Sequence, residues 1–142
     1  MIRYVLDTDH ISLYERAHPQ VSSRIIDIRQ NSLDILSTTV VTVEEQYAGR
    51  IAQIRKAVTA QALIKAYERL KQTFAVLLEF DILEYNLQAD QYLREFRKAG
   101  IRIGTQDLRI ACIVIAHGSV LLTRNRQDFE KVPGLNIQDW SI

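Results

Sequence analysis

Three short apolar runs lie far apart along the chain, at residues 2–6, 34–39 and 119–125. They are rich in aliphatic and β-branched residues and are too short for typical helices, which predicts buried strands. Because strands that are buried on both faces are typical of parallel sheets, these runs predict the centre of a parallel sheet.

Between the second and third runs, the apolar positions recur at helical spacing. Steps of four and three residues separate the members of one stripe, Leu63, Tyr67, Leu70, Phe74 and Leu77. This spacing predicts a helix of about five turns with one apolar face. A second helical segment, residues 86–98, ends in the sequence RKAG, which is typical of a helix C-terminus. We expect these two helices to form a hairpin.

A third helix is predicted from Gln106 to His117. Thr105 is a suitable N-cap residue, and the segment IACIVIA is apolar on every side, which predicts a helix buried between layers. His117 is expected to cap its C-terminus, and Gly118 ends it just before the third apolar run. Strands and helices alternate in this order, so we predict an α/β fold whose parallel sheet is covered by helices on both faces.

No repeat, low-complexity tract or Pro/Gly/Ser-rich linker divides the chain. The 142 residues, of which 47% are hydrophobic and 25% charged, therefore predict one folded domain, residues 1–142. No apolar run is long enough to span a membrane, and the first residues lack the pattern of a secretory signal. We expect a cytoplasmic protein with no membrane partner.

Cysteine and histidine usage excludes two classes of site. Cys112 is the single cysteine and lies within the apolar helix, which favours a packed thiol over a catalytic one. His10, His18 and His117 are scattered without the spacing of metal ligands, so a zinc site is not expected.

Acidic residues follow the predicted strands at the points where ligands bind in parallel α/β sheets, beyond the carboxyl ends of the strands. Asp7 and Asp9 follow the first strand, Asp107 lies in the first turn of the buried helix, and Asn125 and Asp128 follow the third strand. All five can face one edge of the sheet. Each also has a purely structural explanation, because Asp and Asn are common helix caps and turn formers and an acid is favoured at a helix N-terminus.

Glu45 lies in a helical segment after the second strand, with small residues on the next turns. Two alternatives stay open: Thr42 and Glu45 match a capping box, and Glu44 could be the inward acid instead. Carboxylates that are held close together repel one another unless a cation or shared protons offset the charge. Oxygen ligands without a Cys or His cluster favour Mg²⁺ or Mn²⁺, which would activate a water molecule for phosphodiester hydrolysis.

Four segments together resemble the PIN-domain ribonucleases, and most closely the VapC-type toxins of toxin–antitoxin pairs. They are LDTD at the start, EEQYAG after the second strand, IGTQDLRIACIVIAHG for the buried helix and LLTRNRQDFEKVPGL near the end. The resemblance covers the whole chain and implies a three-layer α/β/α PIN-like domain with a central parallel sheet. It implies catalytic acids at Asp7, Glu45, Asp107 and Asp128, with Mg²⁺ or Mn²⁺ bound by Asp7 and Asp107.

Two positions depart from the family pattern. Relatives often carry an amide where this chain has Asp9, which is therefore either an extra acid near the metal or an N-cap of the first helix. The last motif offers both Asn125 and Asp128. We rank Asp128 higher because a charged group binds a hard cation better than an amide does, and we expect Asn125 to make a secondary contact with substrate.

The net charge of +1 does not by itself indicate a nucleic-acid partner, but the distribution of cations does. Six lie within a few residues of the predicted acids: Arg97, Lys98, Arg102, Arg109, Arg124 and Arg126. Together they favour a rim that binds the RNA backbone, with Arg102, Arg124 and Arg126 as substrate contacts. For any single arginine, a solvated surface charge is the simpler interpretation.

The resemblance implies a metal-dependent endoribonuclease toxin that forms a homodimer and is inhibited by a cognate antitoxin. One alternative enzyme is a haloacid-dehalogenase-like phosphatase, because Asp7-x-Asp9 matches the start of that motif, although no lysine has the right context. The non-enzymatic alternative is a PIN-like module that binds a partner. The stripe from Leu63 to Leu77 is compatible with each of these functions. It could be core, a homodimer face or a groove for the antitoxin, and core is the default interpretation.

Overall fold

The structure, a computed structural model, describes residues 1–142 and contains five short strands. They are β1 (Arg3–Leu6), β2 (Ile35–Thr39), β3 (Asp81–Leu83), β4 (Val120–Leu122) and β5 (Asn136–Gln138). All pair in parallel, in the order β3-β2-β1-β4-β5. The three apolar runs of the sequence are thus the three central strands, which confirms that prediction. The two edge strands, β3 and β5, were not predicted.

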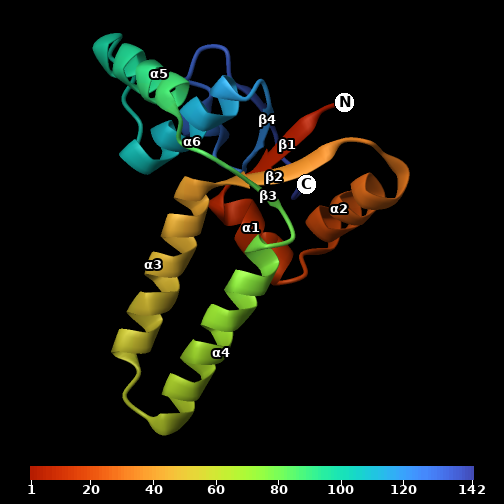
Figure 1. The fold of residues 1–142 in the computed structure, drawn as a ribbon, viewed down its shortest axis with the longest axis vertical. Coiled ribbons are helices and arrows are strands. Elements are labelled where there is room, and N and C mark those ends of the chain that lie inside the picture. The colour runs from red at the N-terminus through yellow and green to blue at the C-terminus, as the bar shows by residue number, and fades with distance from the viewer.

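Seven helices surround the sheet (Figure 1). They are α1 (Thr8–Glu15), α2 (Pro19–Asn31), α3 (Val40–Lys56), α4 (Ala60–Leu77), α5 (Leu87–Lys98), α6 (Thr105–Ala116) and α7 (Arg126–Phe129). No helix is both long and apolar enough to cross a membrane.

Two separate apolar cores, one on each face of the sheet, confirm the three-layer arrangement. Neighbouring side chains of a strand point to opposite faces. Val5 and Leu121 accordingly pack with α5 and α6, while Leu6 and Leu122 pack with α1, α2 and the end of α4. β1 and β4 therefore support both cores, which explains their apolar sequences, whereas β2 contributes Leu36 to one core and buries Ser37, Thr38 and Thr39.

Helix α6 is the buried helix that the sequence predicts. Its apolar residues between Leu108 and Val114 are buried, and Cys112 is buried among them. Burial also raises the pKa of the Cys112 thiol to about 12, as expected for a packed thiol. The helix ends at His117, whose backbone N–H donates to Ile113 O, and the following Gly118 has a positive φ of 59°.

The predicted N-cap of this helix is wrong by one residue. Gly104 is the N-cap and Thr105 is already helical. The Thr105 hydroxyl instead accepts a hydrogen bond from Arg97 Nη2, at 3.1 Å. Arg97 also donates to two carbonyl groups of the loop before α6, so its guanidinium holds this loop in place.

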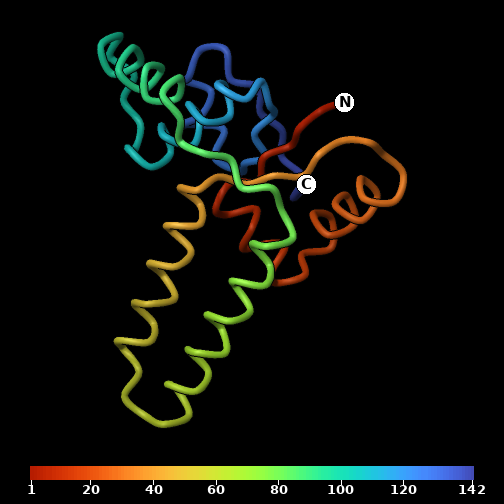
Figure 2. The backbone as a smooth tube through the Cα atoms, in the orientation of Figure 1, coloured from red at the N-terminus to blue at the C-terminus, as the bar shows by residue number.

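A helical hairpin is present, but its partners differ from the prediction. Helices α3 and α4 run side by side and project away from the sheet, while both chain termini lie near the sheet (Figure 2). The segment between α4 and α5 forms strand β3, which pairs with β2, so α5 crosses to the other face and packs on α6. An intervening strand therefore prevents the hairpin of α4 with α5.

The default interpretation, that the apolar stripe on α4 is core, is wrong for the projecting part of this helix. Leu63, Tyr67 and Phe74 are 40%, 55% and 53% exposed, whereas Leu77 is buried at the sheet end of the helix. The buried positions along the projecting part are Ala66 and Thr73. The fully buried positions along the projecting part of α4 are therefore small, and the Phe74 ring makes one larger contact, with Tyr47 of α3 at 6.4 Å between ring centroids.

Candidate active site

Asp7 follows β1 at the carboxyl edge of the sheet and caps α1. Its backbone N–H donates to Leu122 O of β4, and its Oδ1 accepts a 2.8 Å hydrogen bond from the backbone N–H of His10. The side chain is 9% exposed. The helix-cap explanation is therefore correct for Asp7, and it occupies only one of the two carboxylate oxygens. The N-cap alternative for Asp9 is wrong because Asp7 holds that position.

Glu45 on α3, and not Glu44, is the inward acid. The Thr8 hydroxyl donates a 2.6 Å hydrogen bond to Glu45 Oε1, which joins the starts of α1 and α3. Glu44 is exposed and accepts from Gln106 Nε2. Thr39 caps α3 by accepting from the backbone N–H of Thr42, so the capping box of Thr42 with Glu45 is wrong.

Asp107 lies in the first turn of α6, close to the three other predicted acids. Its burial, together with the negative charges of Glu45, Asp7 and Asp128, raises the pKa of its carboxyl group to about 6. The fold thus brings all four predicted acids close enough to act on one group, although they come from four separate segments of the chain.

Asn125 and Asp128 form one short turn after β4. Asn125 caps α7: its side-chain carbonyl accepts from the Asp128 backbone N–H, and its amide donates to Asp128 Oδ2 at 3.1 Å. Asp128 Oδ1 lies 3.7 Å from Lys131 Nζ. Both residues therefore have the local role expected of turn formers, and the charge of Asp128 also reaches Asp107.

The predicted cationic rim is only partly directed at the acids. Arg124 Nη1 lies 3.7 Å from Asp9 Oδ2, and both side chains are about half exposed. Arg126 pairs with Glu130, and Arg102 is exposed without an ion pair. Asp9 is not among the charges that raise the pKa of Asp107.

Two other predicted cations have structural contacts. Arg97 holds the loop before α6, as described above, and Arg109 donates to Gln106 on its own helix. Lys98 ends α5 and is exposed. Arg97 and Arg109 therefore contribute less to a rim than their sequence positions indicated.

The donor set fits a hard divalent cation. Burial, and after it the repulsion from the neighbouring carboxylates, raises the pKa of Asp107. No group of three His, Cys, Asp or Glu side chains is arranged to hold a metal ion between them. Mg²⁺ does not require such a cage, because it usually keeps several waters and binds one or two carboxylates directly. Asp7 and Asp107 could supply those carboxylates.

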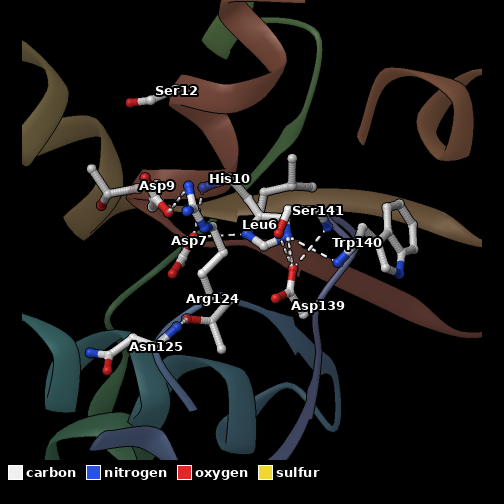
Figure 3. A network of polar contacts seen from close by, with 12 residues as sticks. Leu6, Asp7, Asp9, His10, Ser12, Arg124, Asn125, Asp139, Trp140 and Ser141 are labelled. Carbon is white, nitrogen blue, oxygen red and sulfur yellow. Dashed lines mark hydrogen bonds and ion pairs between the residues drawn. The ribbon is translucent and has the colours of Figure 1, made fainter. Parts of the chain in front are cut away.

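One element of the site was missed from the sequence. His10 is completely buried beside Asp7, and the C-terminal residues Asp139 and Trp140 contact its other side (Figure 3). The available signal was its position three residues after Asp7, on the first turn of the helix that Asp7 caps. The C-terminal contacts had no signal, since they join residues 130 positions apart.

No family model matches the chain, but curated proteins align with it along its length. The ribonuclease VapC2 of Rickettsia felis is 24% identical over 96% of this chain and 97% of its own. The tRNA(fMet)-specific endonuclease VapC of Salmonella typhimurium is 24% identical over 99% of both chains. The plasmid stability protein StbB of Pseudomonas syringae pv. tomato is 33% identical over 94% of both.

Solved structures match over the same extent. VapBC2 from Rickettsia felis, bound to a DNA fragment from its promoter, contains a chain that superimposes with a TM-score of 0.79 at 20% identity, covering 98% of this chain and 99% of that one. VapBC-1 from nontypeable Haemophilus influenzae gives 0.78 at 23% identity, covering 99% and 100%. At this identity, the likeness confirms the fold.

Proposed function

Since this chain belongs to the VapC family of PIN-domain proteins, we propose that it is a metal-dependent endoribonuclease, the toxin of a type II toxin–antitoxin pair. It hydrolyses phosphodiester bonds of RNA. The observation that carries this proposal is the convergence of four acids at the carboxyl edge of the sheet: Asp7, Glu45, Asp107 and Asp128. Burial and the charges of the other three raise the pKa of Asp107.

Asp7 and Asp107 are the direct ligands of the proposed Mg²⁺ or Mn²⁺. Oδ1 of Asp7 caps α1, so Oδ2 is left for the cation. The cation, when bound, supplies the Lewis acid that activates water and offsets the charge developing on the phosphodiester. Its charge would also offset the repulsion among the acids, which adds to burial in raising the pKa of Asp107.

Glu45 and Asp128 support the reaction without binding the cation directly. The Thr8 hydroxyl fixes Oε1 of Glu45, so Oε2 is available to orient an attacking water or accept its proton. Both oxygens of Asp128 already have partners on its own turn, Asn125 and Lys131, which favours an indirect role through water.

RNA binds across the acidic edge with its backbone against Arg124, Arg126 and Arg102, and with Asn125 as a polar contact. Arg124 is the best supported of these, since it lies beside Asp9, and Asp9 is in the first turn of the helix that Asp7 caps. The relative that is named as a tRNA(fMet)-specific endonuclease makes tRNA the first substrate to test.

Two protein partners belong to this proposal. The matching structures are complexes named VapBC, which supports a cognate antitoxin for this chain. The exposed apolar stripe on α4 supports a homodimer, because contiguous exposed apolar surface typically marks an interface. An RNA substrate used in translation implies that the protein acts in the cytoplasm.

RNA cleavage with and without Mg²⁺ tests the enzyme directly. We expect purified protein to cut a tRNA pool only when Mg²⁺ or Mn²⁺ is added, and Asp7→Asn and Asp107→Asn to be inactive while folded. Binding of RNA without cleavage at any metal concentration would instead support the non-catalytic module.

The phosphatase alternative has its own control. The charged or polar side chains beside Asp7 and Asp9 in this structure are His10 and Arg124 and not a lysine, which disfavours the phosphatase. Metal-dependent turnover of a small phosphomonoester such as p-nitrophenyl phosphate, with trapping of a phosphoaspartate at Asp7, would contradict the endoribonuclease.

A further inference from the structure

His10 is a buried histidine that the proposed reaction does not use. Its side chain is completely buried, with Nδ1 3.4 Å from Asp7 Oδ1 and Nε2 3.7 Å from Asp139 Oδ1 (Figure 3). Asp7 belongs to the first strand–helix junction, whereas Asp139 follows the last strand. The imidazole therefore bridges an active-site acid and the C-terminal segment.

The contact with Trp140 determines which ring nitrogen carries the proton. The backbone N–H of Trp140 donates to His10 Nε2 at 3.2 Å, so Nε2 must present a lone pair. The ring proton of the neutral imidazole is then on Nδ1, the nitrogen that faces Asp7. Nδ1 has no other polar partner, being buried and unbonded apart from this 3.4 Å contact.

The two oxygens of Asp7 thereby have different roles. Oδ1 accepts from the His10 backbone N–H at 2.8 Å and faces the His10 ring, so both donors of one residue lie against the same oxygen. The backbone hydrogen bond fixes Oδ1, the ring nitrogen 3.4 Å away adds a second polar contact to the same oxygen, and neither contact involves Oδ2.

The C-terminal segment holds the ring from the opposite side. Asp139 is itself fixed by Ser141, whose backbone N–H and hydroxyl donate to Oδ1 at 2.8 and 2.6 Å. The Trp140 ring is buried against Tyr4, with the ring centroids 4.9 Å apart. The C-terminal segment that contacts the His10 ring is therefore well packed.

We propose that His10 is a positioning residue for the metal-binding Asp7: the Nδ1–H of its ring, oriented by the hydrogen bond that Nε2 accepts from Trp140, faces Asp7 Oδ1 and favours the orientation in which Oδ2 is presented to the cation. This inference rests on the proposed function, since it assigns His10 to the same site. Groups that orient a metal ligand in this way typically contribute about 10- to 100-fold to metal affinity or activity.

Three substitutions separate positioning from packing. His10→Asn keeps an amide N–H near the Nδ1 position, His10→Gln moves it toward the Nε2 position, and His10→Leu fills the space without a donor. Leu13→Ala, at a buried position on the same helix that does not contact Asp7, is the matched control for loss of stability.

The readout is Mn²⁺ affinity without RNA, measured by calorimetry or electron paramagnetic resonance, with RNA cleavage across a Mn²⁺ titration as a second measurement. We expect His10→Leu and His10→Gln to bind Mn²⁺ about 10- to 100-fold more weakly. Added Mn²⁺ should partly restore their cleavage, while His10→Asn and Leu13→Ala should stay within about threefold of the wild-type affinity.

Wild-type affinity in folded His10→Leu, or equal weakening in His10→Asn and His10→Leu, would overturn the proposal. A measurement on the unaltered protein remains valid even if the variants do not fold. Long-range ¹H–¹⁵N correlation spectra should show His10 with a protonated Nδ1 and an unprotonated Nε2, and the reverse tautomer would overturn the proposal.

The control for the proposed function is Asp107→Asn. If the wild-type protein binds Mn²⁺ no more tightly than Asp107→Asn and cleaves no RNA, the proposed function fails, and the role of His10 fails with it. If those two proteins differ as expected while His10→Leu matches the wild type, only the role of His10 fails.

Discussion

The hydroxyl of Thr8 donates a 2.6 Å hydrogen bond to Oε1 of Glu45, 37 positions later in the chain. This contact joins the first turn of α1 to α3. Gln46 adds to the same junction by donating to Thr8 O and to the Ser12 hydroxyl. The first two strand–helix units are thus fixed to each other at the point where their acids lie.

Thr8→Val removes the hydroxyl at nearly constant volume and should lower the rate of RNA cleavage at least about tenfold. A hydrogen bond to a charged group is worth about 1.5–3 kcal/mol, and about 1.4 kcal/mol corresponds to a factor of ten in rate. Thr8→Ser, which keeps the hydroxyl, is the control. Equal kcat/KM in Thr8→Val and the wild type would show that orientation of Glu45 does not matter.

Asp7→Asn should abolish cleavage and leave the fold intact. Asn is as good an N-cap as Asp, so the hydrogen bond from the His10 backbone N–H persists while the charge is lost. Asp7→Ala should also be inactive and lose about 1 kcal/mol of stability with the cap. Denaturant unfolding and a cleavage assay check both, and residual activity near wild type in either variant would contradict the role of Asp7.

The raised pKa of Asp107 predicts how the stability of the metal-free protein depends on pH. In the folded state the group has a pKa of about 6, against an ordinary value of 3.8, so the folded protein binds this proton more tightly than the unfolded chain. Its stabilising effect is complete below 3.8 and is lost as the pH rises through about 6.

We therefore expect the stability of the wild type, relative to Asp107→Asn, to decrease between about pH 4 and 6. Denaturant unfolding of both proteins in chelator across this range provides the measurement. Parallel stability curves would show that Asp107 does not carry the shifted pKa.

Mg²⁺ should raise the Tm of the wild type at neutral pH, because a ligand that binds only the folded state stabilises it. At ten times Kd the expected stabilisation is about 1.4 kcal/mol. Asp107→Asn should show a much smaller shift, and Glu44→Gln, which alters an exposed acid next to the site, should respond like the wild type. An equal response in all three would indicate binding elsewhere.

Tyr67→Glu tests the exposed stripe on α4. Tyr67 is 55% exposed, so a charge there should cost little stability in a monomer but should disrupt an apolar interface. We expect the wild type to sediment as a dimer and the variant as a monomer with a similar fold. A monomeric wild type would refute the homodimer.

The apolar runs were sufficient to predict the three central strands because β1 and β4 support a core on each face and β2 is buried along most of its length. Strands β3 and β5 escaped prediction because they are three-residue edge strands with exposed polar residues such as Asp81 and Asn136. Missing β3 also led to the wrong hairpin, since the strand between α4 and α5 separates those helices.

The acids were predictable because each follows a strand or begins a helix at the edge where ligands bind. The stripe from Leu63 to Leu77 was misassigned because helical spacing shows that a face is apolar but not what covers it. The contacts of His10 with Asp139 and Trp140 depend on tertiary structure alone.

The pairing of β1 with both β2 and β4 has a consequence for synthesis on the ribosome. β1 leaves the ribosome first, but it can pair on its second side only when β4, residues 120–122, has been made. Pairing between such distant segments slows folding. Asp107 and Asp128 are also translated long after Asp7. A nascent chain therefore lacks the assembled acids until most of it has been made, and the activity proposed here can begin only after the polypeptide is almost complete.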